Sequence, residues 1–207
     1  MRWFLGFLIT LVVASPALAA DLTVTVRDSK GAPVEDAVVT LESAASAGAG
    51  PIRFPWPYRM VQRDIAFHPF VLIVPVGAEV RFPNNDKVRH HVYSFSAAKK
   101  FQLKLYGEDE SRSVVFDKAG TVGLGCNIHD RMMAFIDVVD TPWAAKTSGG
   151  VAVLADAPSG PAVLTVWHPF MTGKPVRRSI VLPARGQPAE AAVIDLRPPV
   201  AAAKMRM

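Results

Sequence analysis

The chain has 207 residues, of which 50% are hydrophobic, and its formal net charge is +5. This length allows one large or two small domains with buried cores. The basic residues are scattered and form no run, so the chain lacks the pattern typical of nucleic-acid-binding proteins. The single cysteine excludes an internal disulfide.

Residues 1–20 have the composition and order of a secretory signal peptide. Arg2 is followed by an apolar run over 3–13 and by the small-x-small site Ala17-Leu18-Ala19. A membrane anchor is the less favoured alternative, because the run is short for a bilayer and no later stretch is long and uncharged enough to cross one. We expect an exported, periplasmic protein with no membrane span, cleaved near Ala19 or Ala20.

The first mature segments read as strands. Residues 22–26 alternate strictly, turn residues follow at 28–33, and 37–41 is a second strand, so a hairpin over 22–41 is expected. Residues 43–50 are small and Gly-rich and read as a linker, which three prolines at 51–57 extend.

From residue 60 the chain becomes a run of short strands with Gly, Pro, Asn and Asp between them. The expected strands are 60–67, 70–74, 79–82, 91–95, 101–105, 113–116, 121–125 and 134–139, with a single helical turn as a weaker possibility at 96–100. Eight short strands with regular turn spacing predict a β-sandwich.

Further strands are expected at 151–154, 162–167, 178–182 and 192–196, before a flexible tail at 198–207. The hairpin over 22–41 is too small to bury its own apolar face. We therefore expect residues 21–48 and 146–197 to form one small, discontinuous sandwich, with a unit over 51–142 inserted in it. Two separate β pieces flanking the inserted unit are the alternative.

Two segments resemble a known family. Residues 26–39 (VRDSKGAPVEDAVV) look like the opening of carboxypeptidase-regulatory-like (transthyretin-like) sandwiches, and 158–167 resembles their closing strands. The resemblance implies a stabilising or display role for this part of the chain.

The tripeptide His-Pro-Phe occurs at 68–70 and again at 168–170, and because the surroundings differ we interpret the repeat as chance.

The most informative stretch is 126–133 (CNIHDRMM). It places Cys126 three positions before His129 and six before Met132. A thiolate, an imidazole and a thioether in one short loop suit copper better than other common metals, and a metal would also protect a lone thiol after export. The second histidine that such a site needs is offered at 90 or 91.

These elements resemble the cupredoxins, the type 1 copper proteins. The segment 84–90 (NNDKVRH) is similar to the first-ligand loop of plastocyanin, and the 126–132 loop is similar to that of amicyanin. The fuller pattern over 74–130 resembles exported cupredoxins that are labelled methylamine utilization proteins. The resemblance implies a cupredoxin-like Greek-key β-sandwich and one type 1 copper ion held by His90, Cys126, His129 and Met132.

Two choices stay open from the residues alone. Strand alternation turns only one of His90 and His91 toward the metal, and counting from the turn favours His90. Met132 is favoured over Met133 on the amicyanin-like spacing. Asn85 is a candidate to hold the ligand loop, and the resemblance implies electron exit through His129, beside Ile128 and Met133, with rim charges at 87, 89, 130 and 131.

We expect a carrier of single electrons between redox partner proteins, such as a cytochrome or a dehydrogenase. We do not expect an enzyme, because no catalytic carboxylate pair and no nucleophile–base arrangement stands out. A copper chaperone or store is one alternative. A structural or interaction protein with a degenerate copper site is another, and a copper enzyme would need a second metal site.

Overall fold

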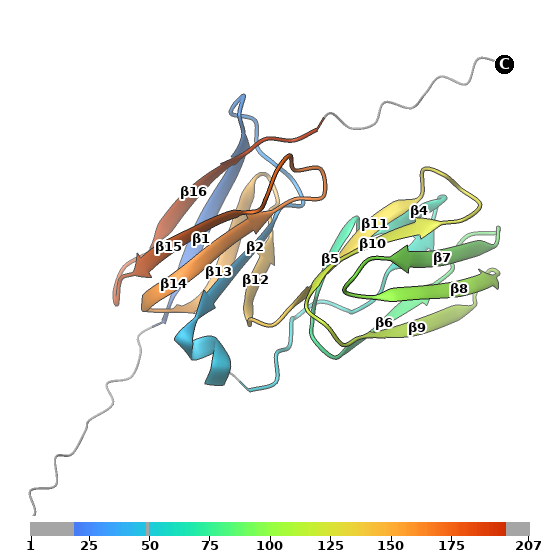
Figure 1. The fold of residues 1–207 in the computed structure, drawn as a ribbon, viewed down its shortest axis with the longest axis horizontal. Helices are drawn as coiled ribbons and strands as arrows, with labels where there is room; N and C mark the ends of the chain where they lie inside the picture. Colours follow the sequence, from blue (N-terminus) through green and yellow to red (C-terminus); the bar gives the residue numbers. More distant parts are fainter. Residues whose placement is uncertain (1–18, 49, 198–207) are drawn as a thin grey trace, which may run out of the picture.

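The computed structural model describes residues 19–48 and 50–197. The leader up to residue 18 and the tail 198–207 lie outside the described residues. The prediction of an all-β chain built from β-sandwiches is confirmed: β-strands form two lobes side by side, and the one short helix among the described residues is η1 (Ala44–Gly48) (Figure 1). No helix within the described ranges has the length and hydropathy needed to cross a membrane.

The first lobe holds the central part of the chain. Its larger sheet has the order β5-β11-β10-β7-β8, made of β5 (Val71–Pro75), β7 (His90–Phe95), β8 (Lys100–Tyr106), β10 (Gly120–Cys126) and β11 (Met133–Val139). Two-stranded sheets are formed by β6 (Ala78–Pro83) with β9 (Ser111–Phe116), and by β3 (Val61–Arg63) with β4 (Ala66–His68).

Period-2 alternation explains how these strands form a core. In β6, Ala78, Val80 and Phe82 are buried, whereas Glu79 and Arg81 between them are exposed. The buried residues of β6 join those of β7, β9, β10 and β11 in one hydrophobic cluster. β5 is buried along its whole length, because the second lobe covers its other face.

The second lobe combines the two ends of the described chain. One sheet has the order β13-β1-β16 and contains β1 (Ala19–Asp28), β13 (Val151–Pro158) and β16 (Ala189–Ile194). The other has the order β12-β2-β14-β15 and contains β2 (Val38–Ser43), β12 (Trp143–Lys146), β14 (Gly160–Trp167) and β15 (Val176–Leu182). Their apolar faces share one core.

The expected hairpin over 22–41 is wrong. β1 pairs with β13 and β16, whereas β2 pairs with β12 and β14, so the two strands lie in opposite sheets. Each strand has an apolar face, and placing the two faces against each other across the sandwich buries both at once.

Three local expectations also change. The expected strand over 60–67 is the hairpin β3–β4, because Asp64 and Ile65 both adopt positive φ and turn the chain back. The weaker possibility of a helical turn at 96–100 is not realised, and the chain makes a turn there in which Lys99 N donates to the Ser96 carbonyl at 3.1 Å. The expected linker over 43–50 contains η1.

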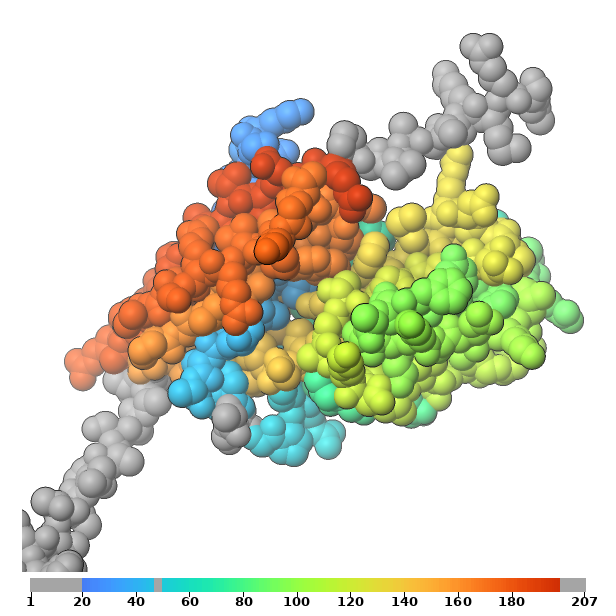
Figure 2. Space-filling view, viewed as in Figure 1, coloured from blue at the N-terminus to red at the C-terminus, as the bar shows by residue number. Residues whose placement is uncertain are grey.

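Aromatic side chains join the two lobes, which are in contact in the space-filling view (Figure 2). The rings of Phe70 and Phe170 lie 5.6 Å apart, and Phe135 lies 5.6 Å from Phe70 and 6.1 Å from Trp167. The two His-Pro-Phe tripeptides, whose repetition we interpreted as chance, therefore meet at this junction through their phenylalanines.

Candidate metal centre

Three potential ligands converge at one end of the larger sheet. His90 is the first residue of β7, Cys126 is the last residue of β10, and His129 lies in the loop that leads to β11. The Cys126 Sγ lies 3.7 Å from the Nδ1 of His90 and 3.6 Å from the Nδ1 of His129. Of the described residues, these form the one group of three or more such side chains close enough to hold an ion, with all ligand atoms within 4.8 Å of one another.

The donor set fits a copper ion. Metal–ligand distances in protein sites are about 2.0–2.3 Å for imidazole nitrogen and thiolate sulfur, so two donors of one ion lie a little under 4 Å apart. Both sulfur–nitrogen separations meet that condition. His90 and Cys126 are buried and His129 is half-buried, so an ion here would be shielded from most of the solvent. Two imidazoles with one thiolate are the trigonal set of blue-copper sites.

Backbone hydrogen bonds fold the ligand loop. The Met132 N donates to the His129 carbonyl at 2.9 Å, and the Cys126 N donates to the Met132 carbonyl at 3.2 Å. These bonds bring the end of the loop back beside its beginning. Met132 is 2% exposed and belongs to the core of the first lobe, whereas Met133 is 40% exposed. The burial of the two side chains favours Met132 as the one that can reach the site.

A carboxylate orients the first histidine. The Nε2 of His90 lies 2.8 Å from the Oδ2 of Asp86. With Nε2–H donated to Asp86, the lone pair of the neutral ring is on Nδ1, the atom that faces Cys126. Burial raises the pKa of Asp86, but hydrogen bonds from His90 and from two backbone amides outweigh burial and hold this pKa below its usual range.

Asn84 holds the loop, and Asn85 does not have the expected role. The buried Asn84 donates from Nδ2 to the Val88 carbonyl at 2.8 Å, and its Oδ1 accepts from the Asp86 N at 2.9 Å. Asn85 is exposed and contributes its backbone N to the Gln62 carbonyl. Asp86 and Asn84 were not among the residues expected at the site, although an Asn two positions before an Asp is a recognisable Asx-turn pattern.

A buried polar group also supports the strand that carries His90. Tyr106 is the pairing partner of His90 on β8, and its hydroxyl donates to the Phe82 carbonyl at 2.9 Å while accepting from Gln62. Burial raises the pKa of Tyr106 to about 12, so the hydroxyl keeps its proton at neutral pH. These bonds tie β8 to β6 beneath the candidate site.

The remaining histidines do not join the cluster. His91 is half-buried, and its Nε2 has no hydrogen-bond partner among the described residues. His68 is exposed near the junction of the lobes. His168 is buried in the second lobe, where burial lowers its pKa and its Nδ1 accepts from the Phe170 N.

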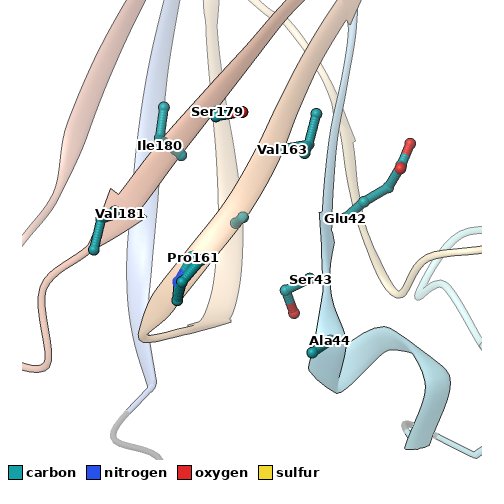
Figure 3. A pocket seen from close by; sticks show the side chains of 9 residues that line it. Glu42, Ser43, Ala44, Pro161, Val163, Ser179, Ile180 and Val181 are labelled. Carbon is teal, nitrogen blue, oxygen red and sulfur yellow. The ribbon is translucent and has the colours of Figure 1, made fainter.

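A surface groove on the second lobe lies away from this centre (Figure 3). Strands β2, β14 and β15 line it, with Val163, Ile180 and Val181 among the apolar residues. Its one carboxylate, Glu42, is paired with Arg177 at 2.8 Å. The groove therefore presents no arrangement of reactive groups.

No family model and no curated protein sequence matches this chain. Among solved structures, the chain is similar to a copper-containing nitrite reductase from Thermus scotoductus SA-01, with 27% identity over 45% of this chain and 26% of that one, and a TM-score of 0.39. It is also similar to a purple cupredoxin from Nitrosopumilus maritimus (20% identity, 39% and 98% coverage, TM-score 0.36) and to a mutant of amicyanin (20% identity, 49% and 98% coverage, TM-score 0.37). The chain spans about a quarter of the nitrite reductase.

Proposed function

We propose that this protein binds one copper ion and carries single electrons between redox partners. His90, Cys126 and His129 are the proposed equatorial ligands, and Met132 is the proposed axial ligand. The observation that supports this most directly is the convergence of two imidazole nitrogens on the Cys126 sulfur, at 3.7 and 3.6 Å.

The chemistry of these side chains suits a metal that changes oxidation state. Bound copper would supply a one-electron couple, and a soft thiolate with two imidazoles serves both of its states with little rearrangement. Asp86 orients His90, strands β7 and β10 carry His90 and Cys126, and backbone hydrogen bonds fold the loop that carries His129 and Met132. This support limits reorganisation, which is what electron transfer requires of the protein.

The rest of the proposal concerns context. We propose residues 51–142 as a copper domain and residues 21–48 with 146–197 as a supporting sandwich, in an exported, periplasmic protein. The partner would be a cytochrome or a dehydrogenase. The link to methylamine utilization stays a prediction, because no described residue bears on it, and the absence of enzyme activity stays a prediction as well.

The decisive experiment adds Cu(II) to the purified mature protein and records visible absorption and electron paramagnetic resonance. We expect an intense sulfur-to-copper charge-transfer band in the wild type that Cys126→Ser abolishes, because only the thiolate can give it. His91→Gln is the matched control, and it should keep the band because His91 lies outside the cluster.

Two results would contradict the proposal. A wild-type protein that binds copper without a charge-transfer band would not be a type 1 carrier, and a colourless protein that holds only Cu(I) would indicate a store or chaperone. A His91→Gln variant that loses the band while His90→Gln keeps it would reassign the first ligand.

A further inference from the structure

A row of residues crosses the outer face of the larger sheet directly behind the candidate metal centre. Tyr93 on β7 pairs with Gln102 on β8 and with Gly125 on β10, and Gly125 pairs with Met133 on β11. Directly paired residues present their side chains on the same face of a sheet. Cys126, the next residue after Gly125, points the opposite way into the core.

At Gly125 the strand has no side chain on its outer face, and the ring of Tyr93 fills the space at that position. A Cβ added at Gly125 would lie 2.8 Å from both the Cζ and the hydroxyl of Tyr93, so the ring packs directly on the glycine backbone. The phenol ring is therefore in contact with the residue covalently bonded to Cys126. This aromatic contact lies on the far side of the strand from His129.

The aromatic contact continues to the surface. The Phe95 ring lies 5.1 Å from the Tyr93 ring and is 68% exposed, and Met133 is 40% exposed. The second lobe covers the neighbouring part of the same sheet, where Phe135 meets Trp167. The green β7–β8 segment lies at the surface of the first lobe in Figure 2. Phe95 is the exposed aromatic residue here, and Tyr93 is half-buried beside it. Aromatic residues and methionine are enriched at interaction sites.

Two lysines on the edge strand β8 flank this apolar area on one side. Lys100 pairs directly with Phe95, and Lys104 follows on the same face of β8. Within the described chain, neither lysine has an ion-pair partner. We define the Tyr93 face as Tyr93, Phe95, Lys100, Gln102, Lys104 and Met133. It contains two lysines and no carboxylate.

We propose that the Tyr93 face is a docking surface for a redox protein whose own contact region is acidic. This inference rests on the proposed function. It adds a second route for the electron, besides the route through His129. One electron would pass between the site and the docked partner, one being oxidised as the other is reduced, and Tyr93 would provide contact without being oxidised itself. The lysines would accelerate encounter more than they strengthen binding.

Binding can be tested without any metal in the protein. The probe is hexacyanochromate(III), an inert paramagnetic anion, and the readout is broadening of amide signals in the metal-free, isotope-labelled protein. We expect the strongest broadening at residues 93–95 and 100–104. Lys100→Glu with Lys104→Glu should weaken binding roughly tenfold. The control, Lys30→Glu with Lys174→Glu, makes the same charge change on the second lobe and should leave the broadening unchanged.

A rate measurement tests the aromatic contact. The reduced, copper-loaded protein passes one electron to hexacyanoferrate(III), which becomes hexacyanoferrate(II). Tyr93→Leu should slow this step severalfold because the ring that contacts Gly125 is lost, whereas Tyr93→Phe keeps the ring and should not slow it. Visible absorption must be unchanged in both variants, which shows that the metal site itself is intact.

The possible failures can be told apart. Broadening centred on residues 127–131, or broadening unaffected by the two lysine reversals, would overturn the docking surface while leaving the copper assignment in place. An equal rate for Tyr93→Leu and wild type would overturn the second route for the electron. Absence of a charge-transfer band in a protein whose Tyr93 face still binds the anion would instead overturn the proposed function.

Discussion

At the scale of single residues, the candidate centre depends on groups that do not themselves belong to the ligand set. Asp86 fixes which nitrogen of His90 faces the cysteine, and Asn84 fixes the turn that carries Asp86. A histidine without such a partner can rotate and change tautomer, and it then binds a metal less tightly. The residues flanking the ligands are thus as informative as the ligands.

Removing the Asp86 carboxylate should weaken copper binding. We expect Asp86→Ala to lower copper affinity by about 10–100-fold, because the His90 ring loses its hydrogen-bond acceptor. Asp86→Asn should lose less, since its amide oxygen can still accept the bond. Competition with a chelator of known affinity measures both values.

Asp86 also accepts hydrogen bonds from the backbone amides of Asp64 and Ile65. The unfolding temperature of each metal-free variant therefore serves as the control, since it reports any loosening of the β3–β4 turn. If copper affinity fell only in those variants whose metal-free form also lost stability, and by a matching amount, the orienting role of Asp86 would be contradicted.

At the scale of secondary structure elements, two glycines of β10 and one carboxylate of β11 show how closely neighbouring strands pack against these two strands. Gly123 and Gly125 lie under the rings of Phe135 and Tyr93, so aromatic residues on neighbouring strands cover them. Asp137 on β11 is different, because it places a carboxyl group in a crowded part of the sheet. Burial raises its pKa, and the hydrogen bond from the Thr121 hydroxyl at 2.9 Å opposes that rise only in part.

Asp137 should make the protein less stable as the pH rises. A folded-state pKa above the unfolded value means that the folded state binds more protons between the two values, so stability is highest below the unfolded pKa and falls as pH rises through the folded pKa. At pH 7 the charged carboxylate is therefore a cost. We expect Asp137→Asn to raise the unfolding temperature at pH 7, and the advantage to vanish at low pH.

The exposed Asp117 provides a control of opposite sign. Its hydrogen bond with Lys99 lowers its pKa, so its contribution to stability is present above the unfolded pKa and is lost on acidification. Asp117→Asn should accordingly bring no gain at pH 7. Thermal unfolding of both variants across a pH series decides the matter, and a destabilised Asp137→Asn at pH 7 would contradict the prediction.

At the scale of the whole molecule, two hydrophobic cores are joined by a smaller third cluster. The first core surrounds the candidate centre, the second core lies within the sandwich built from the two chain ends, and the third cluster holds Val38, Val71, Ile73, Val139 and Ala144. Phe70, Phe135 and Phe170 extend this junction. Separate cores with a limited junction are typical of domains that unfold in separate steps.

Calorimetry should separate the two units. If copper binds at the first core as proposed, and only to folded protein, then by mass action it should raise the unfolding temperature of one transition and leave the other in place. Phe170→Ala should cost roughly 1–2 kcal/mol, since its ring is half-buried, and should widen the gap between the transitions. It should keep the charge-transfer band.

Val181→Ala is the control for this prediction, because Val181 is 76% exposed on the second lobe and contacts no junction ring. It should leave both transitions unchanged. A single transition that copper shifts as a whole would show one cooperative unit, and the division into two domains would then be wrong.

The sequence by itself determined most of the strands and named the candidate ligands, although β12 was not expected and the expected strand over 60–67 is a hairpin. Strict alternation in residues 22–26 and the spacing of Cys126, His129 and Met132 are local patterns, and local patterns are visible without coordinates. For the same reason the loop over 84–90 could be recognised as the source of the first histidine.

Only the tertiary structure decided which strands pair and which side chains are in contact. β1 and β2 lie in opposite sheets, Asp86 contacts His90, Tyr93 covers Gly125, and two distant phenylalanines share one junction. Strand partners and cross-strand contacts depend on how apolar faces are buried over the whole chain, and that burial is a collective free energy with no signature at any one position. Residue spacing could therefore suggest candidate ligands, but only the packed fold could bring His90, Cys126 and His129 together and place the aromatic face behind them.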